Sequence, residues 1–325
     1  MRKRMRGALP LILTDAPQTS GIRQNAPALM TNPMTDPRKI RTPDGRSLDL
    51  YVAGPEGGET LVFYNGTPSA GLLSAGVVKA ASERGMRVVS WTRPGYGGST
   101  RQPGRKVADV VPDTVAVLDQ LGVERCYAIG WSGGGSHVLA AAAMLPERVR
   151  AVATIASTAP YPAEGLDWTA GMGKENVEGF GWAFAGAEAL LPHMDEDWQN
   201  FRSVTGDQVA AAFGDLVDEV DRASISGEFA EEIAASFREA LRPGWWGWFD
   251  ENLADVEPWG FDLASIRVPV HVWQGRHDRM VPYSHGEWLA THIPTACPHL
   301  SEEHGHLSLI VDSMPEILDE LIGSN

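Results

Sequence analysis

Short apolar runs alternate along this chain with longer stretches whose apolar residues recur at helical spacing. Four of the runs are continuous and rich in β-branched or aromatic residues: 59–64, 86–91, 125–130 and 149–156. Stretches of helical composition separate them: 69–84, 107–121 and 136–145. Strands that are apolar throughout are buried on both faces, as in a parallel sheet covered by helices. The pattern therefore predicts an α/β fold with a mostly parallel sheet and helices on both faces.

The two ends of the pattern extend this sheet. Residues 38–54 alternate around Pro43-Asp44-Gly45 and predict a hairpin that adds an antiparallel edge. Near the C-terminus the apolar run 268–273 resumes the sheet, and three elements are expected after it: a helix over 283–292, a weak strand over 295–300 and a terminal helix from about 307 to 322.

A long interruption separates the two parts of the sheet. Residues 160–262 contain seven of the 11 tryptophans and 22 acidic residues against five basic ones. Segments such as 206–220 and 228–241 have helical composition and no strand period. We predict a helical cap over 159–262, inserted before the strand at 268, with core parts over 38–158 and 263–325. Its acidic charge is typical of solvated helix faces, or else forms a field that favours cationic substrates. Its tryptophans fit a cap core, with some lining a pocket.

The first 37 residues show no period, and we expect a flexible tail or an over-long gene start, with Met34 as an alternative beginning. A basic stretch precedes an apolar one, as in a signal peptide, but the apolar part is short, broken by proline and followed by Asp15. No stretch reaches the roughly 20 apolar residues of a membrane span. The expected compartment is the cytoplasm.

The charge and composition of the chain argue against several classes of binding partner. The net charge of −15 argues against nucleic acid and against anionic membranes. Of the two cysteines, Cys126 fits a buried strand position and Cys297 a free thiol, so we expect no disulfide. No cluster has zinc-ligand spacing and no glycine-rich loop carries a P-loop lysine, so no metal or cofactor is expected. The oligomeric state stays open.

The candidate nucleophile is Ser132. It lies in Gly130-Trp-Ser-Gly-Gly, between an apolar strand and a helical stretch. In such a turn the nucleophile has a strained backbone, and glycines on either side let strand and helix approach closely. The hydroxyl then stands above the C-terminal edge of the sheet, where open α/β sheets place their ligands.

A serine nucleophile needs a base, and a neutral imidazole needs a carboxylate that fixes its tautomer. Asp278 and His306 follow in that order, each on a loop just past a predicted strand. His304 is the alternative base, but the Gly-His-Leu context favours His306. We interpret His137, His271 and His277 as structural or solvent-facing residues.

Four motifs together resemble the α/β-hydrolase superfamily, in its cap-bearing branch, from about residue 38 onward: Asn65-Gly-Thr-Pro, Arg93-Pro-Gly-Tyr-Gly-Gly-Ser, Gly130-Trp-Ser-Gly-Gly, and Gly275-x-x-Asp-x-x-Val-Pro followed by Gly305-His306. The resemblance implies Ser132 as nucleophile, His306 as general base and Asp278 as its orienting acid. It also implies that the backbone N–H groups of Thr67 and Gly133 form the oxyanion hole. The family usually has His-Gly where this chain has Asn65-Gly66.

The expected function is hydrolysis of small to medium, fairly apolar carboxylic esters through an acyl-enzyme. Similar haloalkane dehalogenases and epoxide hydrolases have Asp in place of Ser132, which disfavours those reactions. Three alternatives stay open: a prolyl-aminopeptidase-like enzyme that holds a free amine with acidic cap residues, a cofactor-free perhydrolase, and a non-catalytic small-molecule receptor. The sequence does not indicate the acyl or alcohol group.

Overall fold

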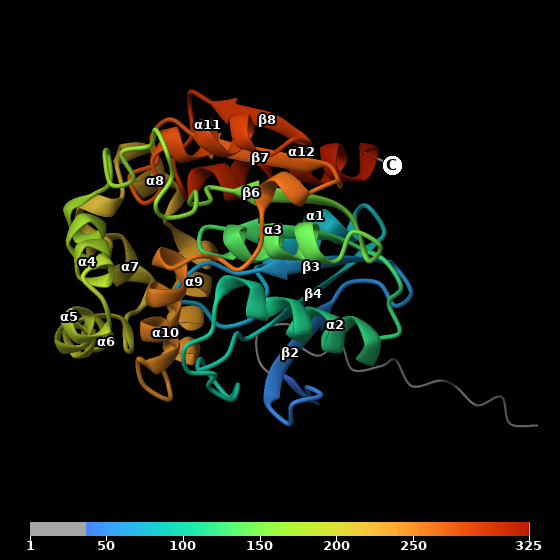
Figure 1. Cartoon of the computed structure of the whole chain (residues 1–325), viewed down its shortest axis with the longest axis horizontal. Helices are drawn as coiled ribbons and strands as arrows, with labels where there is room; N and C mark the ends of the chain where they lie inside the picture. Colours follow the sequence, from blue (N-terminus) through green and yellow to red (C-terminus); the bar gives the residue numbers. More distant parts are fainter. Residues whose placement is uncertain (1–36, 325) are drawn as a thin grey trace, which may run out of the picture. The chain divides into compact units, whose positions relative to one another are not determined.

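The computed structural model describes residues 37–324, so the predicted N-terminal tail lies, except for Pro37, outside the described residues. The described strands form one eight-stranded sheet in the order β1-β2-β4-β3-β5-β6-β7-β8 (Figure 1). Pairing is parallel except for β1 with β2 and β2 with β4. The strands are β1 (Arg38–Arg41), β2 (Ser47–Ala53), β3 (Glu59–Tyr64), β4 (Met86–Trp91), β5 (Cys126–Trp131), β6 (Val149–Ile155), β7 (Val270–Gly275) and β8 (Ala296–Ser301). The predicted fold class and the N-terminal hairpin are confirmed.

Helices cover both faces of the sheet. Helices α1 (Ala75–Ser82) and α12 (Ser308–Gly323) pack in one core cluster, to which Val77 and Ile317 contribute. Helices α2 (Val110–Gln120), α3 (Gly134–Met144) and α11 (Tyr283–His292) pack in another, with Leu118, Val138 and Leu289 fully buried. Alternate side chains of the central strands point into each cluster, which explains why apolar residues occupy consecutive positions in those strands.

The predicted helix over 69–84 is shorter than expected and begins only at Ala75. The amide of Ala70 donates to Ser236 Oγ at 3.1 Å, and that of Gly71 donates to Thr92 Oγ1 at 2.9 Å. Because these donors are satisfied by distant side chains, the segment needs no helical hydrogen bonds. It forms instead an irregular loop that runs from the end of β3 past the nucleophile.

The segment between β6 and β7 is helical, as predicted, and its helices gather at the left of Figure 1. They are α4 (Lys174–Phe184), α5 (Ala187–Leu190), α6 (Met194–Phe201), α7 (Gly206–Ala212), α8 (Glu219–Ser224), α9 (Gly227–Ala240) and α10 (Trp246–Val256). We call residues 160–262 the helical insert. The stretch 206–220 is not one helix, because Gly214 has a φ of 55° and Asp218 caps a new helix by accepting from Val220 N and Asp221 N.

Cys126 is buried and Cys297 exposed, both as free thiols. In the part of the chain that the structure describes, no helix is both long and apolar enough to cross a membrane.

Candidate active site

Ser132 lies at a sharp turn between β5 and α3, with a φ of 54°. Its amide donates to Ile155 O at 2.8 Å, and its carbonyl accepts from Gly135 N at 2.8 Å. A side chain at Gly130 would overlap the Gly134 carbonyl, and one at Gly134 would overlap the Tyr64 carbonyl. The glycines therefore permit the close approach that holds Ser132 in a left-handed conformation rare for residues with a Cβ.

The structure brings His306 and Asp278 together from the loops after β8 and β7. His306 Nδ1 lies 2.8 Å from Asp278 Oδ2, and the two side chains are almost fully buried. Asp278 Oδ2 also accepts from Gln274 Nε2 at 2.9 Å, and Oδ1 accepts from the amides of Met280 and Val281 at 2.9 and 2.7 Å. A carboxylate with this many donors is fixed in place and in turn orients the imidazole.

The protein environment shifts the pKa values of both Asp278 and His306. Burial raises the pKa of Asp278, although the charge of His306 and its hydrogen bond act in the opposite direction. Burial also opposes a charged His306 ring, but the charge and hydrogen bond of Asp278 outweigh it, and the pKa of His306 is raised above its usual value. A ring with a raised pKa accepts a proton readily from a nearby hydroxyl.

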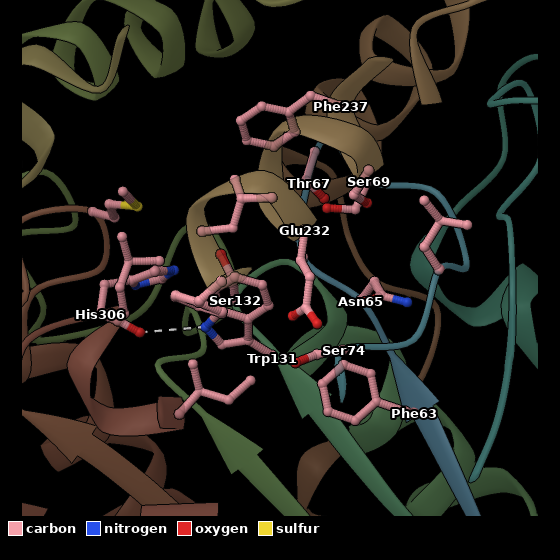
Figure 2. Close-up of a pocket in the computed structure, with 18 of the residues that line it drawn as sticks. Phe63, Asn65, Thr67, Ser69, Ser74, Trp131, Ser132, Glu232, Phe237 and His306 are labelled. Atoms are coloured by element: carbon pink, nitrogen blue, oxygen red, sulfur yellow. Dashed lines mark hydrogen bonds between the residues drawn. The ribbon is translucent and has the colours of Figure 1, made fainter. Parts of the chain in front are cut away.

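Ser132 and His306 line the same cavity, which we call the inner chamber (Figure 2). Its walls are mostly apolar and include Phe63, Leu72, Phe229, Ile233 and Ile310. The chamber has a volume of about 720 Å³ including its open mouth. Among the described residues, no hydrogen bond joins the Ser132 hydroxyl to the His306 ring. Catalytic hydrogen bonds are often long without substrate and tighten when it binds.

Thr67 and Gly133, the predicted oxyanion-hole residues, lie against each other beside Ser132. A side chain at Gly133 would collide with Thr67, and neither amide donates to another residue in the described part of the chain. Both residues line a second cavity with Ser132, which we call the outer chamber. Two unengaged amides next to a nucleophile are suited to hold an oxyanion.

Arg93 supports the loop that carries Thr67, a role the sequence did not indicate. Its Nη1 donates to Asn65 O at 2.5 Å, and its Nη2 donates to Gly66 O at 2.9 Å and to Thr67 Oγ1 at 3.0 Å. Asn65, which departs from the family pattern, donates from its side chain to Ser90 Oγ at 2.9 Å. The loop thus keeps its position without the usual histidine.

A buried charge cluster connects Arg93 to the helical insert. Glu251 on α10 lies 2.7 Å from Arg93 Nε, 3.1 Å from Arg105 Nη2 and 2.8 Å from His137 Nε2. Burial by itself raises the pKa of Glu251, but the two arginines overcome it and hold the pKa well below its usual value. The sequence marked neither Glu251 nor its partners, apart from His137 as a structural histidine.

Asp221, on helix α8 of the insert, is a second residue that the sequence did not reveal. Its carboxylate is fully buried. Oδ2 accepts from His306 N at 2.8 Å, and Oδ1 accepts from Leu307 N, Ser308 N and Ser308 Oγ, each at 2.9 Å. Any side chain at Gly305 would collide with this carboxylate. Asp221 therefore holds the backbone of the proposed catalytic base and caps α12.

The other histidines lie apart from this arrangement. His304 Nδ1 is 2.7 Å from Ser301 Oγ, and His277 Nδ1 is 2.9 Å from Asp218 on the surface. Neither lines the inner or the outer chamber. His271, His299 and Glu320 bring potential metal-ligating atoms within 4.8 Å of one another, but they too lie outside both chambers.

Comparison with known proteins agrees with the fold. Residues 59–313 match the model of the alpha/beta hydrolase fold family. The chain belongs to this family. It is 28% identical over 268 residues to a 2-hydroxymuconate semialdehyde hydrolase of Pseudomonas putida. The aligned residues cover 82% of this chain and 86% of that protein.

Two further relatives are informative. A pimeloyl-[acyl-carrier protein] methyl ester esterase of Aromatoleum aromaticum is 30% identical over 238 residues, 71% of this chain and 84% of that protein. The crystal structure of a hydrolase from Pseudomonas aeruginosa superposes with a TM-score of 0.65 at 20% identity, covering 89% of this chain and 98% of that one. At this identity the superposition shows the fold alone. The relatives' names support a hydrolase and leave its substrate open.

Proposed function

We propose that this hydrolase cleaves carboxylic esters of small to medium apolar compounds, with Ser132 as nucleophile, His306 as general base and Asp278 as the orienting acid. The observation that carries the proposal is the buried His306–Asp278 pair at 2.8 Å, which lines one cavity with Ser132. The apolar walls of the inner chamber support an apolar substrate.

The reaction begins when Ser132 Oγ attacks the ester carbonyl and His306 takes the hydroxyl proton. The oxyanion is held by the amides of Thr67 and Gly133, and the positive end of α3 lies at the same point. Imidazolium then donates its proton to the leaving alcohol oxygen, which leaves an acyl-enzyme. Water attacks next with His306 again as base, and the acid and free Ser132 are released.

The helical insert would act as the cap of this site. Phe213, Phe229 and Phe237 of the insert line the inner chamber together with residues of the sheet. A lid of this kind excludes water from the developing charges, which strengthens the interactions that stabilise them.

A panel of 4-nitrophenyl esters of increasing acyl length tests the proposal, with Ser132→Ala as control and aminoacyl-naphthylamides assayed in parallel. We expect hydrolysis of short to medium acyl esters and its loss in Ser132→Ala. A fluorophosphonate probe should label the wild-type protein at Ser132.

Turnover of the naphthylamides alone would overturn the esterase proposal in favour of an aminopeptidase. Failure of the probe to label folded protein would instead favour the non-catalytic receptor. An assay with hydrogen peroxide, a carboxylic acid and bromide tests perhydrolysis, which the same three residues could support, because the peracid formed would oxidise bromide to a halogenating species.

A further inference from the structure

The outer chamber differs in charge from the inner one. Three carboxylates line it, from Glu175, Asp197 and Asp255, together with the amides of Asn176, Asn200 and Asn252. None of its lining residues is lysine, arginine or histidine. In the inner chamber, by contrast, the one carboxylate is that of Glu232, which accepts from Ala75 N at 2.8 Å.

Asp255 is the decisive residue, because its carboxyl group is buried and one of its oxygens has no hydrogen-bond partner among the described residues. It is 5% exposed, and its Oδ1 has no hydrogen bond within the described part of the chain. The two nearby cations, Arg93 and Arg105, are both engaged by Glu251. A buried carboxylate without a counter-charge is costly for a protein to keep, and burial together with the charge of Glu251 raises the pKa of Asp255 to about 8. A cation bound beside this carboxyl group would favour its charged form and relieve that cost.

Glu175 and Asp197 add to the same deficit of positive charge. Glu175 Oε2 is buried without a hydrogen-bond partner among the described residues. Asp197 is half-buried, and burial and the charge of Glu196 raise its pKa. The aromatic residues Phe180, Phe201 and Trp248 line the same space and offer ring faces that attract cations.

We propose that the outer chamber binds a protonated amine or quaternary ammonium group of the substrate, so that the enzyme prefers esters with a cation on one limb. Ser132 lines both chambers, so an ester bound at its hydroxyl extends one limb into each. The inner chamber takes the apolar limb and the outer chamber the cationic one. The preference for such esters rests on the proposed ester hydrolysis, whereas binding of the cation does not.

The first test measures binding without catalysis. Phenyltrimethylammonium and its uncharged isostere tert-butylbenzene are titrated into the full-length protein by calorimetry. At about pH 9, above the pKa of Asp255, we expect the cation to bind at least about tenfold more tightly, as for a charge held against a carboxylate and aromatic rings in a partly desolvated site. Asp255→Asn and, as a more exposed second variant, Asp197→Asn should each weaken binding of the cation alone. Glu257→Gln is the matched control, because Glu257 is an exposed carboxylate two residues from Asp255 and lines neither chamber.

The second test measures selectivity in turnover. One pair of substrates is choline butyrate and 3,3-dimethylbutyl butyrate; the other is the methyl esters of 6-(trimethylammonio)hexanoate and 7,7-dimethyloctanoate. The first pair carries the cation on the alcohol limb and the second on the acyl limb. In the pair whose charged limb enters the outer chamber, we expect the cationic ester to have a kcat/KM about tenfold or more above that of its neutral partner. Asp255→Asn should abolish this difference. The ratio of kcat/KM within each pair is compared in the same variant, so that a general loss of activity does not alter the comparison.

The outcomes separate the two proposals. If the esters are hydrolysed without preference for the cation and phenyltrimethylammonium binds no better than its isostere, the chamber proposal is wrong and the esterase stands. If no ester is hydrolysed but the cation binds in an Asp255-dependent way, the chamber proposal stands and the esterase is wrong. An equal loss of cation binding in Glu257→Gln would also overturn the chamber proposal, because it would reflect overall charge.

Discussion

Asp221 shows how a single side chain outside the expected triad can control its geometry. One carboxylate accepts four hydrogen bonds from residues 306 to 308, so it determines where the backbone of His306 lies. It contacts neither chamber. Asp221 is therefore a positioning residue for the proposed base.

We predict that Asp221→Asn lowers kcat roughly 10- to 100-fold, because the asparagine amide turns a donor toward N–H groups and displaces the loop. The negative charge of Asp221 helps to raise the pKa of His306, so the variant should also shift the acid limb of the kcat/KM profile to lower pH. Glu219→Gln, an exposed change on the same helix, is the control. A loss of stability with an unshifted pH profile would indicate a purely structural role.

The pH dependence of the reaction follows from His306. The ring must be neutral to accept the Ser132 proton, and its pKa is raised above 6.5. Ester hydrolysis should therefore increase as the pH rises through that raised pKa and be lost below it. Asp278→Asn should lower the midpoint of the limb and reduce kcat roughly 10³- to 10⁴-fold. A profile whose midpoint is the same in wild type and Asp278→Asn contradicts the assigned pair.

At the scale of elements, helix α10 of the insert and the loop after β3 are coupled through buried charges. Glu251 is the shared counter-charge of Arg93 and Arg105, and Arg93 in turn holds the carbonyls of Asn65 and Gly66. The insert and the oxyanion loop are thus positioned by the same ion pairs.

We predict that Glu251→Gln destabilises the protein by about 3–5 kcal/mol, because it leaves two buried guanidinium groups without a counter-charge. Ester hydrolysis should fall at temperatures where the variant remains folded, since Arg93 no longer keeps its place. Denaturant unfolding and kcat/KM measure the two effects, with Glu257→Gln on the same helix end as reference. A stable Glu251→Gln variant with normal activity would show that the coupling is unimportant.

At the scale of the whole molecule, a buried histidine connects the insert to the sheet's covering helix. His285 on α11 accepts from Ala159 N at 3.0 Å through Nδ1 and donates from Nε2 to Trp168 O at 2.7 Å. Burial lowers the pKa of His285 to about 4, against a usual value of 6.5, and the hydrogen bond to Trp168 only partly offsets this.

Because the folded state keeps His285 neutral, the unfolded state binds more protons between the two pKa values. The contribution of neutral His285 to the free energy of unfolding is fully present above about pH 6.5. It falls by about 3 kcal/mol in all as the pH decreases toward 4. We predict that His285→Gln is less stable at pH 7 but has a flatter dependence of Tm on pH between 4 and 6.5. Thermal unfolding across that range measures it, and a slope as steep as in the wild type would contradict the assignment.

The sequence by itself determined the features that depend on residues close together in the chain, namely the strands and the turn at Ser132. Largely apolar runs specified β3, β4 and β6 to the residue or nearly so, because burial on both faces favours apolar residues at consecutive positions. The glycines around Ser132 specified the turn, because only they allow strand and helix to approach so closely. The order of Ser132, Asp278 and His306 indicated the candidate triad.

Only the tertiary structure decided which of 22 acidic residues in the insert have a specific contact. Asp221 meets His306 across 85 positions of chain, and Glu251 meets His137 across 114. Asp255 is distinguished by its burial together with an oxygen that has no partner among the described residues. No local periodicity encodes such contacts, because they arise from how the insert packs on the sheet. The physical reason is that burial and hydrogen bonding, rather than residue type, give each carboxylate its role.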